Sequence, residues 1–356
     1  MIWAIALIIG GLLALAFGGE VLVRGASRLA ALAGISPLVI GLTVVAFGTS
    51  SPELAVSLKA CLSGQTDIAV GNVVGSNILN VLLILGISAL VAPLVVSSQL
   101  IRVDVPLLVL ASVAMLLLGL DGTIGRLDGI GLFVGLVCYI GWSIRQGRRE
   151  ASPVQEEFEK KAAASLEKTP YQIMLQLGLI LLGVLLLTLG AGWLVDGSVT
   201  IARYYGMSEL LIGLTIIAVG TSLPEVAASI LASVKGERDI AVGNVVGSNL
   251  FNIMCVLGLS AAVSPGGVEV SQTALRLDIP VMLATAIACL PIFFTGHVIV
   301  RWEGGLFLGY YLAYTAFLIF AATNPAASRA LGGVMLGFVV PLTVVTLLIG
   351  VVRALK

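Results

Sequence analysis

Two glutamates, Glu53 and Glu225, lie within stretches that are otherwise apolar. Each follows a proline and a short run of hydroxyl residues, in GTSSPE and GTSLPE respectively. An ionisable side chain inside a membrane span is costly, and such residues usually face a cavity and mark an ion path. A carboxylate beside hydroxyl groups forms an all-oxygen site, which suits calcium, magnesium or sodium better than zinc.

The prolines predict additional oxygen ligands from the backbone. Pro52 has no N–H, and its ring would clash with the carbonyl of Gly48, four residues back. We therefore expect carbonyls from Ala46 to Gly48 to point elsewhere, next to the hydroxyls of Thr49 and Ser50. The second stretch repeats this set, with Ala218, Gly220, Thr221, Ser222, Pro224 and Glu225.

The segment DIAVGNVVGSN follows each glutamate, at 67–77 and again at 239–249. Polar residues spaced by four share one face of a helix. The members of these two stripes are Asn72, Ser76 and Asn80, and then Asn244, Ser248 and Asn252. Glycines at every fourth position beside them would let another helix approach closely.

These stripes allow two interpretations. A polar residue in a membrane helix can line an ion cavity, or it can form hydrogen bonds between helices. We expect a cavity for Ser76, Asn80, Ser248 and Asn252. We expect interhelical hydrogen bonds for Asn72, Asn77, Asn244 and Asn249.

The composition requires a membrane environment for these residues. Of 356 residues, 59% are hydrophobic and 11% are charged, whereas a soluble domain has about 25% charged residues. A span needs roughly 20 apolar residues. The apolar runs predict eleven helices, near 2–23, 37–62, 68–91, 104–120, 127–145, 172–195, 208–234, 240–263, 275–295, 302–322 and 331–352.

The basic residues indicate the orientation of these helices. Sorted by alternate loops, 14 lysines and arginines fall on one side and 5 on the other. Because cytoplasmic loops carry the excess of positive charge, the N-terminus is expected outside an inner (plasma) membrane. The smaller set is Lys59, Arg126, Arg203, Arg276 and Arg329.

The chain divides into two hydrophobic halves, 1–145 and 172–322, joined by a polar segment at 146–171. We expect this segment to be a cytoplasmic linker, the alternative being a short helix that begins at Ser152 and Pro153. Residues 323–356 are expected to add an eleventh, peripheral span that packs against the others and does not touch the ions.

The two halves contain a repeat. Residues 40–86 align with 212–258 without gaps, and 28 of the 47 positions are identical. The two copies start five spans apart, so they would cross the membrane in opposite directions. Such inverted repeats are typical of secondary transporters, which bind substrate near the midplane where the repeats meet. The predicted fold is therefore an all-α polytopic membrane protein with a ten-helix core of two inverted five-helix repeats.

The stretches AFGTSSPE…GNVVGSNILN and AVGTSLPE…GNVVGSNLFN resemble the two α-repeats of the cation/calcium antiporter superfamily. The chain is most similar to its prokaryotic sodium/calcium exchangers, over ten helices up to about residue 322. The resemblance implies exchange of sodium for calcium by alternating access, with the first and sixth helices sliding against a rigid core.

The resemblance also implies a role for each matching residue. Glu53 and Glu225 would be the central calcium ligands. The remaining oxygens would come from hydroxyls, backbone carbonyls and amides. Those residues are Thr49, Ser50, Thr221 and Ser222 for hydroxyls, Ala46 and Ala218 for carbonyls, Ser76 and Ser248 for outer sodium sites, and Asn80 and Asn252 for the centre.

The chain departs from some branches of the superfamily. The potassium-dependent branch has Asp at the position of Asn252, and the asparagine here argues against potassium co-transport. The proton-coupled branch usually reads GNxxE, whereas both copies here read GNVVG, which favours sodium.

Three classes of function remain in competition: an antiporter, a calcium channel and an intramembrane enzyme. Paired glutamates would also suit a channel, but the duplicated broken helices favour alternating access, and no nucleophile–base pair or acid dyad indicates an enzyme. Proton/calcium exchange is the alternative among antiporters. We expect no cofactor and no nucleic-acid partner. The expected partners are calcium and sodium ions and the lipid bilayer, and the oligomeric state stays open.

Overall fold

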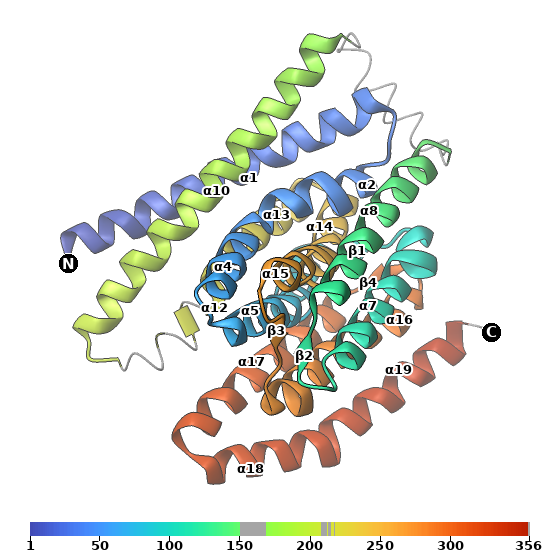
Figure 1. The fold of residues 1–356 in the computed structure, drawn as a ribbon. Coiled ribbons are helices and arrows are strands. Elements are labelled where there is room, and N and C mark those ends of the chain that lie inside the picture. Colours follow the sequence, from blue (N-terminus) through green and yellow to red (C-terminus); the bar gives the residue numbers. More distant parts are fainter. Residues whose placement is uncertain (150–168, 208–211, 213–214, 217, 355–356) are drawn as a thin grey trace.

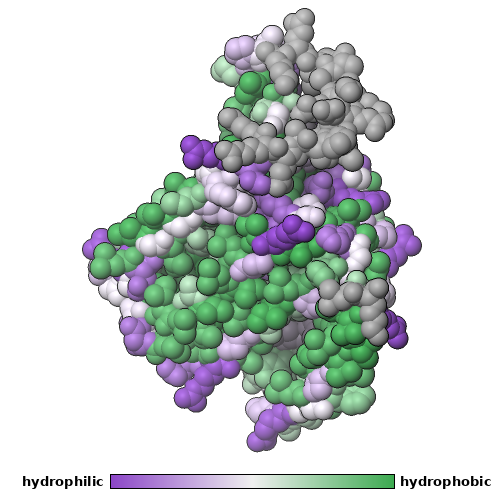
Figure 2. Space-filling model, turned by 90° about the vertical axis from the view of Figure 1, so that its right-hand side faces the viewer, coloured by the Kyte–Doolittle hydropathy of each residue, from purple (hydrophilic) through white to green (hydrophobic). Residues whose placement is uncertain are grey.

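The computed structural model describes residues 1–149, 169–207, 212, 215–216 and 218–354. Two long helices, α1 (Ile2–Ala33) and α10 (Pro170–Tyr204), cross each other along one side of the remaining helices, as Figure 1 shows. The last helices of the chain lie on the opposite side of the molecule. One face of the surface, seen in Figure 2, is mostly hydrophobic, with hydrophilic residues mainly near its edges. Such a surface suits a protein surrounded by lipid.

Glycines hold α1 and α10 together. A Cβ atom placed on Gly11 would lie 2.7 Å from the carbonyl oxygen of Gly190, and one on Gly18 would lie 3.0 Å from that of Gly183. The later residue of α1 meets the earlier residue of α10, so the two helices are antiparallel. Direct backbone contact of this kind makes the α1–α10 pair a tightly packed unit.

The first repeat begins with a helix that breaks at Ser50 and bends by 45°. Pro52 lies in the first turn of the helix after the break, where a missing N–H costs nothing. A second helix, containing the repeated segment, follows. The elements are α2 (Pro37–Ile40), the π-helical η1 (Gly41–Val45), α3 (Ala46–Thr49), α4 (Ser51–Leu62), α5 (Thr66–Leu79), η2 (Asn80–Leu85) and α6 (Gly86–Val91).

The second repeat has the same order of elements where it is described. Its second helix lies at the centre of the molecule, and the most apolar window of Arg238–Val263 is entirely buried. The elements are α12 (Ala218–Gly220), α13 (Leu223–Val234), α14 (Arg238–Phe251), η5 (Asn252–Leu257) and α15 (Gly258–Val263).

The remaining helices enclose this centre. Two antiparallel ladders connect the halves, β1 (Leu94–Val95) with β4 (Val298–Ile299) and β2 (Thr123–Ile124) with β3 (Val268–Glu269). The enclosing elements are η3 (Leu100–Asp104), α7 (Val105–Leu118), α8 (Arg126–Arg149), η6 (Ala274–Asp278), α16 (Ile279–Phe294) and α17 (Arg301–Thr323).

Two tyrosine–aspartate pairs, one buried and one partly buried, join these outer helices, and the sequence did not reveal them. The hydroxyl of Tyr139 donates to Asp104 at 2.9 Å, and that of Tyr314 donates to Asp278 at the same distance. Each pair joins a helix to the next one along the chain, at equivalent places in the two halves. These carboxylates are bound to phenols, and neither of them belongs to the set predicted for the ion site.

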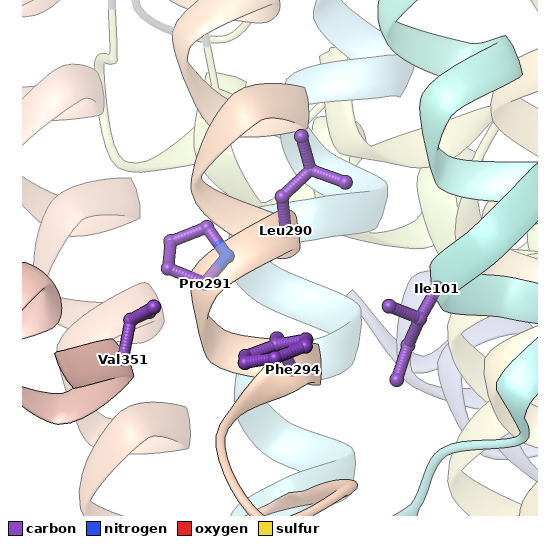
Figure 3. Close-up of a pocket in the computed structure, with 5 residues that line it drawn as sticks. All are labelled: Ile101, Leu290, Pro291, Phe294 and Val351. Atoms are coloured by element: carbon purple, nitrogen blue, oxygen red, sulfur yellow. The ribbon is translucent and has the colours of Figure 1, made fainter. Parts of the chain in front are cut away.

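The C-terminal segment is helical throughout, as α18 (Pro325–Val334), η7 (Met335–Val339) and α19 (Val340–Ala354). It runs antiparallel to α17, because the hydroxyl of Tyr310 donates to Thr343 at 2.7 Å while Gly332 lies beside Phe317. Near its end it covers an apolar pocket of about 320 Å³, drawn in Figure 3. The pocket is lined by Ile101, Leu290, Pro291, Phe294 and Val351.

The polytopic helical fold agrees with the sequence prediction. The described residues contain nine helices long and apolar enough to span a membrane, and the bent pair Pro37–Thr49 with Ser51–Leu62 is a tenth. Part of the seventh predicted span, 208–234, lies outside the described residues, as does the alternative helix start at Ser152.

Some predicted helix ends are wrong. The first span was expected to stop at residue 23, before Arg24, but α1 continues to Ala33. A charged residue ends the apolar run without ending the helix, and α1 stops where Gly34 takes a left-handed conformation with φ 65°. The last helix similarly begins at Pro325 rather than at 331.

The glycine contacts generate a prediction about stability. Gly11→Ala should lower the thermal unfolding midpoint in detergent, because overpacking of this kind costs about 1–3 kcal/mol. The neighbouring Gly10→Ala is the matched control, since its Cβ would meet only a Trp193 ring carbon at 3.7 Å. Equal midpoints for the two variants would show that backbone contact does not hold the pair together.

Candidate functional site

The two glutamates meet at the interface between the repeats, and each is held by a serine of the other repeat. Ser222 donates its hydroxyl to Oε1 of Glu53 at 3.0 Å, and Ser50 donates to Oε1 of Glu225 at 3.0 Å. Both carboxyl groups are buried, with exposed fractions of 0% and 1%. Each lies in the first turn of its helix, just after the break, where the helix dipole favours a negative charge.

The second oxygen of each carboxyl group is oriented differently. Among the described residues, Oε2 of Glu53 and Oε2 of Glu225 have no hydrogen-bond partner. The amide oxygens of Asn80 and Asn252 are likewise buried and unpartnered. Buried polar atoms normally have partners, and all four of these atoms are hard oxygen acceptors of the kind that binds calcium or sodium.

A second pair of asparagines determines how these amides are oriented. The Nδ2 group of Asn80 donates to Oδ1 of Asn249 at 2.9 Å, and that of Asn252 donates to Oδ1 of Asn77 at 3.0 Å. The amino groups are therefore engaged, and the carbonyl oxygens stay without a donor. The sequence predicted interhelical hydrogen bonds for Asn77 and Asn249, and these bonds are confirmed. It did not reveal their orienting role.

The remaining asparagines of the stripes are also interhelical, as predicted. Asn72 donates to Ser57 at 3.0 Å, and Asn244 donates to Ser229 at 2.9 Å. The sequence analysis passed over these two serines. The signal that could have found them is that both copies of the repeat place serine at the same position, in ELAVS and EVAAS.

The threonine hydroxyls bridge the repeats in this structure. Thr49 donates to Oδ1 of Asn244 at 3.2 Å, and Thr221 donates to Oδ1 of Asn72 at 3.4 Å. The oxygen lone pairs of both hydroxyls are still able to accept or to bind a cation. The threonines thus lie beside the glutamates and connect the two broken helices through the asparagine stripes.

The two stripe serines differ from each other. The hydroxyl of Ser76 lies 3.0 Å from that of Ser222 and can donate to it while Ser222 donates to Glu53, so Ser76 extends the chain that leads to Glu53. Its counterpart Ser248 is fully buried, and its hydroxyl has no partner among the described residues. The structure therefore brings Ser76 to the carboxylate network of the site and leaves Ser248 without a hydrogen bond.

The expectation of a freed carbonyl at Ala46 is wrong for this structure. The Ala46 oxygen accepts the backbone N–H of Ser50 at 2.9 Å. Because α3 ends before Ser50 and Pro52 lies in the first turn of α4, the missing N–H of Pro52 removes no backbone hydrogen bond from α3. Each carbonyl oxygen has two lone pairs, so one remains for a further partner. In the second repeat, Ala218 is the first residue of α12, and the Ser222 N–H bonds to Val219 instead.

The access to the site is unequal between the repeats. A Cβ on Gly243 would lie 2.9 Å from the carbonyl of Leu38, and one on Gly247 would lie 2.6 Å from that of Leu42, so α2 and η1 cover α14. The equivalent Gly71 is exposed, and no atom of the described residues lies within 4 Å of a Cβ placed there. The α14 side of the site is therefore covered by the chain, whereas the helix face around Gly71 of α5 is exposed with respect to the described residues.

Comparison with known proteins decides the family. The sequence profile of the sodium/calcium exchanger proteins matches residues 3–145 and 175–320, which include both repeats and both glutamates. The chain belongs to the sodium/calcium exchanger protein family. The resemblance drawn from GTSxPE and GNVVGSN is thereby confirmed, and the C-terminal helices beyond residue 320 lie outside the matched region.

Two relatives with similar sequences come from a bacterium and an archaeon. The chain is 43% identical over 289 residues to the inner membrane protein YrbG of Escherichia coli K12, covering 81% of this chain and 87% of that protein. It is 31% identical over 342 residues to the sodium/calcium exchanger MaX1 of Methanosarcina acetivorans, covering 87% and 97% respectively.

A solved structure of the family shows the same fold. The sodium-calcium exchanger NCX_Mj, soaked without sodium and calcium, superposes with a TM-score of 0.76 at 29% identity. The match covers 89% of this chain and 99% of that one. The family and the fold together make the protein a multi-pass membrane protein of the cation/calcium antiporter superfamily.

The amide network generates a prediction. Asn249→Ala should reduce the rise in thermal midpoint that calcium produces, because Asn80 loses the partner that orients its oxygen. Removing one partner of a buried hydrogen bond costs about 1–3 kcal/mol. Ser88→Ala serves as the control, since that buried hydroxyl has no partner among the described residues. An unchanged calcium effect in Asn249→Ala would contradict the orienting role.

Proposed function

We propose that this protein is a secondary active antiporter that exchanges sodium for calcium by alternating access and extrudes calcium electrogenically. The observation that carries the proposal is the pair of buried carboxyl groups, each with one oxygen bonded to the opposite repeat and one unpartnered. Two buried negative charges side by side are costly unless cations compensate them. One divalent ion supplies this compensation, and so do several sodium ions.

The proposed ligands are the residues that the sequence singled out. Oε2 of Glu53 and Oε2 of Glu225 bind calcium, with the amide oxygens of Asn80 and Asn252 beside them. The other oxygens complete the calcium site or hold sodium. They are the hydroxyls of Thr49, Ser50, Thr221 and Ser222, the carbonyls of Ala46 and Ala218, and the outer sodium ligands Ser76 and Ser248.

Shared ligands explain exchange rather than co-transport. Calcium and sodium both need the same two carboxylates, so they compete for one site. The neutral oxygens around that site provide further places for sodium, so more than two sodium ions replace one calcium ion. Net charge then moves in each cycle, which makes transport electrogenic. Among the described residues, no three His, Cys, Asp or Glu side chains are grouped so that they could hold a metal ion. In the proposed site, the two carboxylates are therefore supplemented by neutral oxygens.

The proposed topology follows from the distribution of charge. The N-terminus lies outside an inner membrane, and the linker 146–171 lies in the cytoplasm between the transporting halves, 1–145 and 172–322. Residues 323–356 form a peripheral span that returns the C-terminus to the cytoplasm. In this orientation the exposed face around Gly71 of α5 lies toward the outside, and the covered face of α14 lies on the cytoplasmic side.

Calcium flux tests the coupling ion. Proteoliposomes loaded with sodium and diluted into sodium-free buffer should take up radioactive calcium, while potassium-loaded vesicles should not. An interior-positive potential should accelerate the uptake, because net positive charge leaves in each cycle. Equal uptake driven by a proton gradient alone would assign the protein to proton/calcium exchange instead.

Substitutions at the site test the ligands. Glu225→Gln keeps the shape but removes a charge, and losing a buried charged partner costs about 2–5 kcal/mol, at least ~30-fold in calcium affinity. Asn252→Ala removes one neutral oxygen and should cost about five-fold. Calcium titration of the thermal midpoint measures both, and the midpoint without ions shows whether each variant is folded. Wild-type affinity in Glu225→Gln would refute the assignment.

A further inference from the structure

A cluster of charges outside the ion site joins α1 to the turn between α13 and α14. Lys235 in this turn forms an ion pair with Glu20 of α1, and Arg24 binds the same carboxyl oxygen. About two helical turns after Glu20 along α1, the hydroxyl of Ser27 donates to Oε1 of Glu237 at 2.9 Å. The Glu20 and Lys235 side chains are 29% and 24% exposed, so the ion pair is partly exposed to solvent.

The pseudo-equivalent positions in the other half lack the ion pair. The offset of 172 residues that aligns the repeats places Gly192 at the position equivalent to Glu20, and Ser63 at that of Lys235. Val199 is equivalent to Ser27, and Gln65 to Glu237. Arg24, in contrast, is equivalent to the exposed, acidic Asp196.

The backbone of the two halves is nevertheless alike at these places. The turns have matching left-handed glycines, Gly64 with φ 75° and Gly236 with φ 81°. Gly11 and Gly18 of α1 likewise map by the same offset onto Gly183 and Gly190 of α10. The halves therefore differ here in charge rather than in shape.

The cluster lies on the side of the molecule where the site is sealed. The turn that carries Lys235 leads directly into α14, whose Gly243 and Gly247 are covered by Leu38 and Leu42. This cover is the continuation of α1, to which it is joined by only three residues, 34–36. Uncovering α14 therefore requires α1 to move away from the turn that it is tied to.

We propose that Glu20, Lys235, Ser27 and Glu237 form a one-sided latch that stabilises the state sealed over α14. Because the positions equivalent to Glu20 and Lys235 hold the uncharged Gly192 and Ser63, the latch biases the equilibrium between the two open states of the transporter. This inference rests on alternating access as part of the proposed function, but not on which ion drives it. A partly exposed ion pair of this kind shifts an equilibrium by about two- to five-fold.

Thiol accessibility tests the latch without any transported ion. Ile68→Cys, in a background with the four native cysteines replaced by alanine, places a thiol on the exposed face of α5 without adding bulk, and its equivalent Ile240 on the covered α14 is buried. Lys235→Ala or Glu20→Ala should slow its modification by an impermeant maleimide, because less of the protein remains in the state sealed over α14. The paired exchange Glu20→Lys with Lys235→Glu should restore the rate.

Two further variants sharpen the test. Lys59→Ala, at the exposed end of α4, is the matched control and should leave the rate unchanged. Gly192→Glu with Ser63→Lys places a mirror-image pair on the other half, at exposed positions, and should also slow modification by favouring the opposite state. Unchanged rates in Lys235→Ala and Glu20→Ala would overturn the latch, whatever the flux measurements show about sodium. So would a charge exchange that fails to restore the rate.

Discussion

The reciprocal hydrogen bonds between the two glutamates and the serines of opposite repeats are the interaction on which the rest of the structure depends. Each carboxyl group is buried at the start of a helix, and each receives its only serine donor in the described part of the chain from the other half. Neither repeat can satisfy its own glutamate in this way, so the halves must associate before either carboxyl group is partnered. The asparagine stripes on α5 and α14 then add further bonds in the same reciprocal pattern.

The reciprocal bonds also favour the proposed binding of hard cations. The hydroxyls of Ser50 and Ser222 donate to the glutamates, and the amino groups of Asn80 and Asn252 are bound by the other asparagine pair. Oxygen atoms are therefore what remains turned toward the centre. Holding acceptors in place before the ion arrives lowers the cost of organising the ligands, which is the general advantage of preorganisation.

Glycine contacts hold α1 and α10 to each other, and the core adds hydrogen bonds between buried polar residues to its own close contacts. The pair packs against the core through a buried apolar cluster that includes Leu22, Ile180 and Ala228. It is also connected to the core through the chain at 34–36 and through the charges at Glu20 and Lys235. Because the α1–α10 pair is tightly packed, it can move as a rigid body against the core, while the ligands within the core keep their relative positions.

The sequence by itself determined the class of protein and most of its site. Long apolar runs form membrane helices because unpaired backbone groups are too costly in lipid. A glutamate within such a run is itself costly, and it therefore indicates a functional site. Duplication of GTSxPE and GNVVGSN identified the residues that meet at the centre, since the same polar positions recur in both halves. The local break at Pro52 was also visible, because proline constrains its own neighbourhood.

Only the tertiary structure decided how those residues are paired. Spacing places Asn77, Asn80 and Ser57 on helices, but their partners lie on other helices or on the opposite repeat, and no local rule selects among several polar groups. The bonded carbonyl of Ala46, the unpartnered hydroxyl of Ser248 and the covered face of α14 depend on which helices lie against each other. The same reason explains the charge cluster at Glu20, whose partner Lys235 is more than two hundred residues away along the chain and adjacent only after folding.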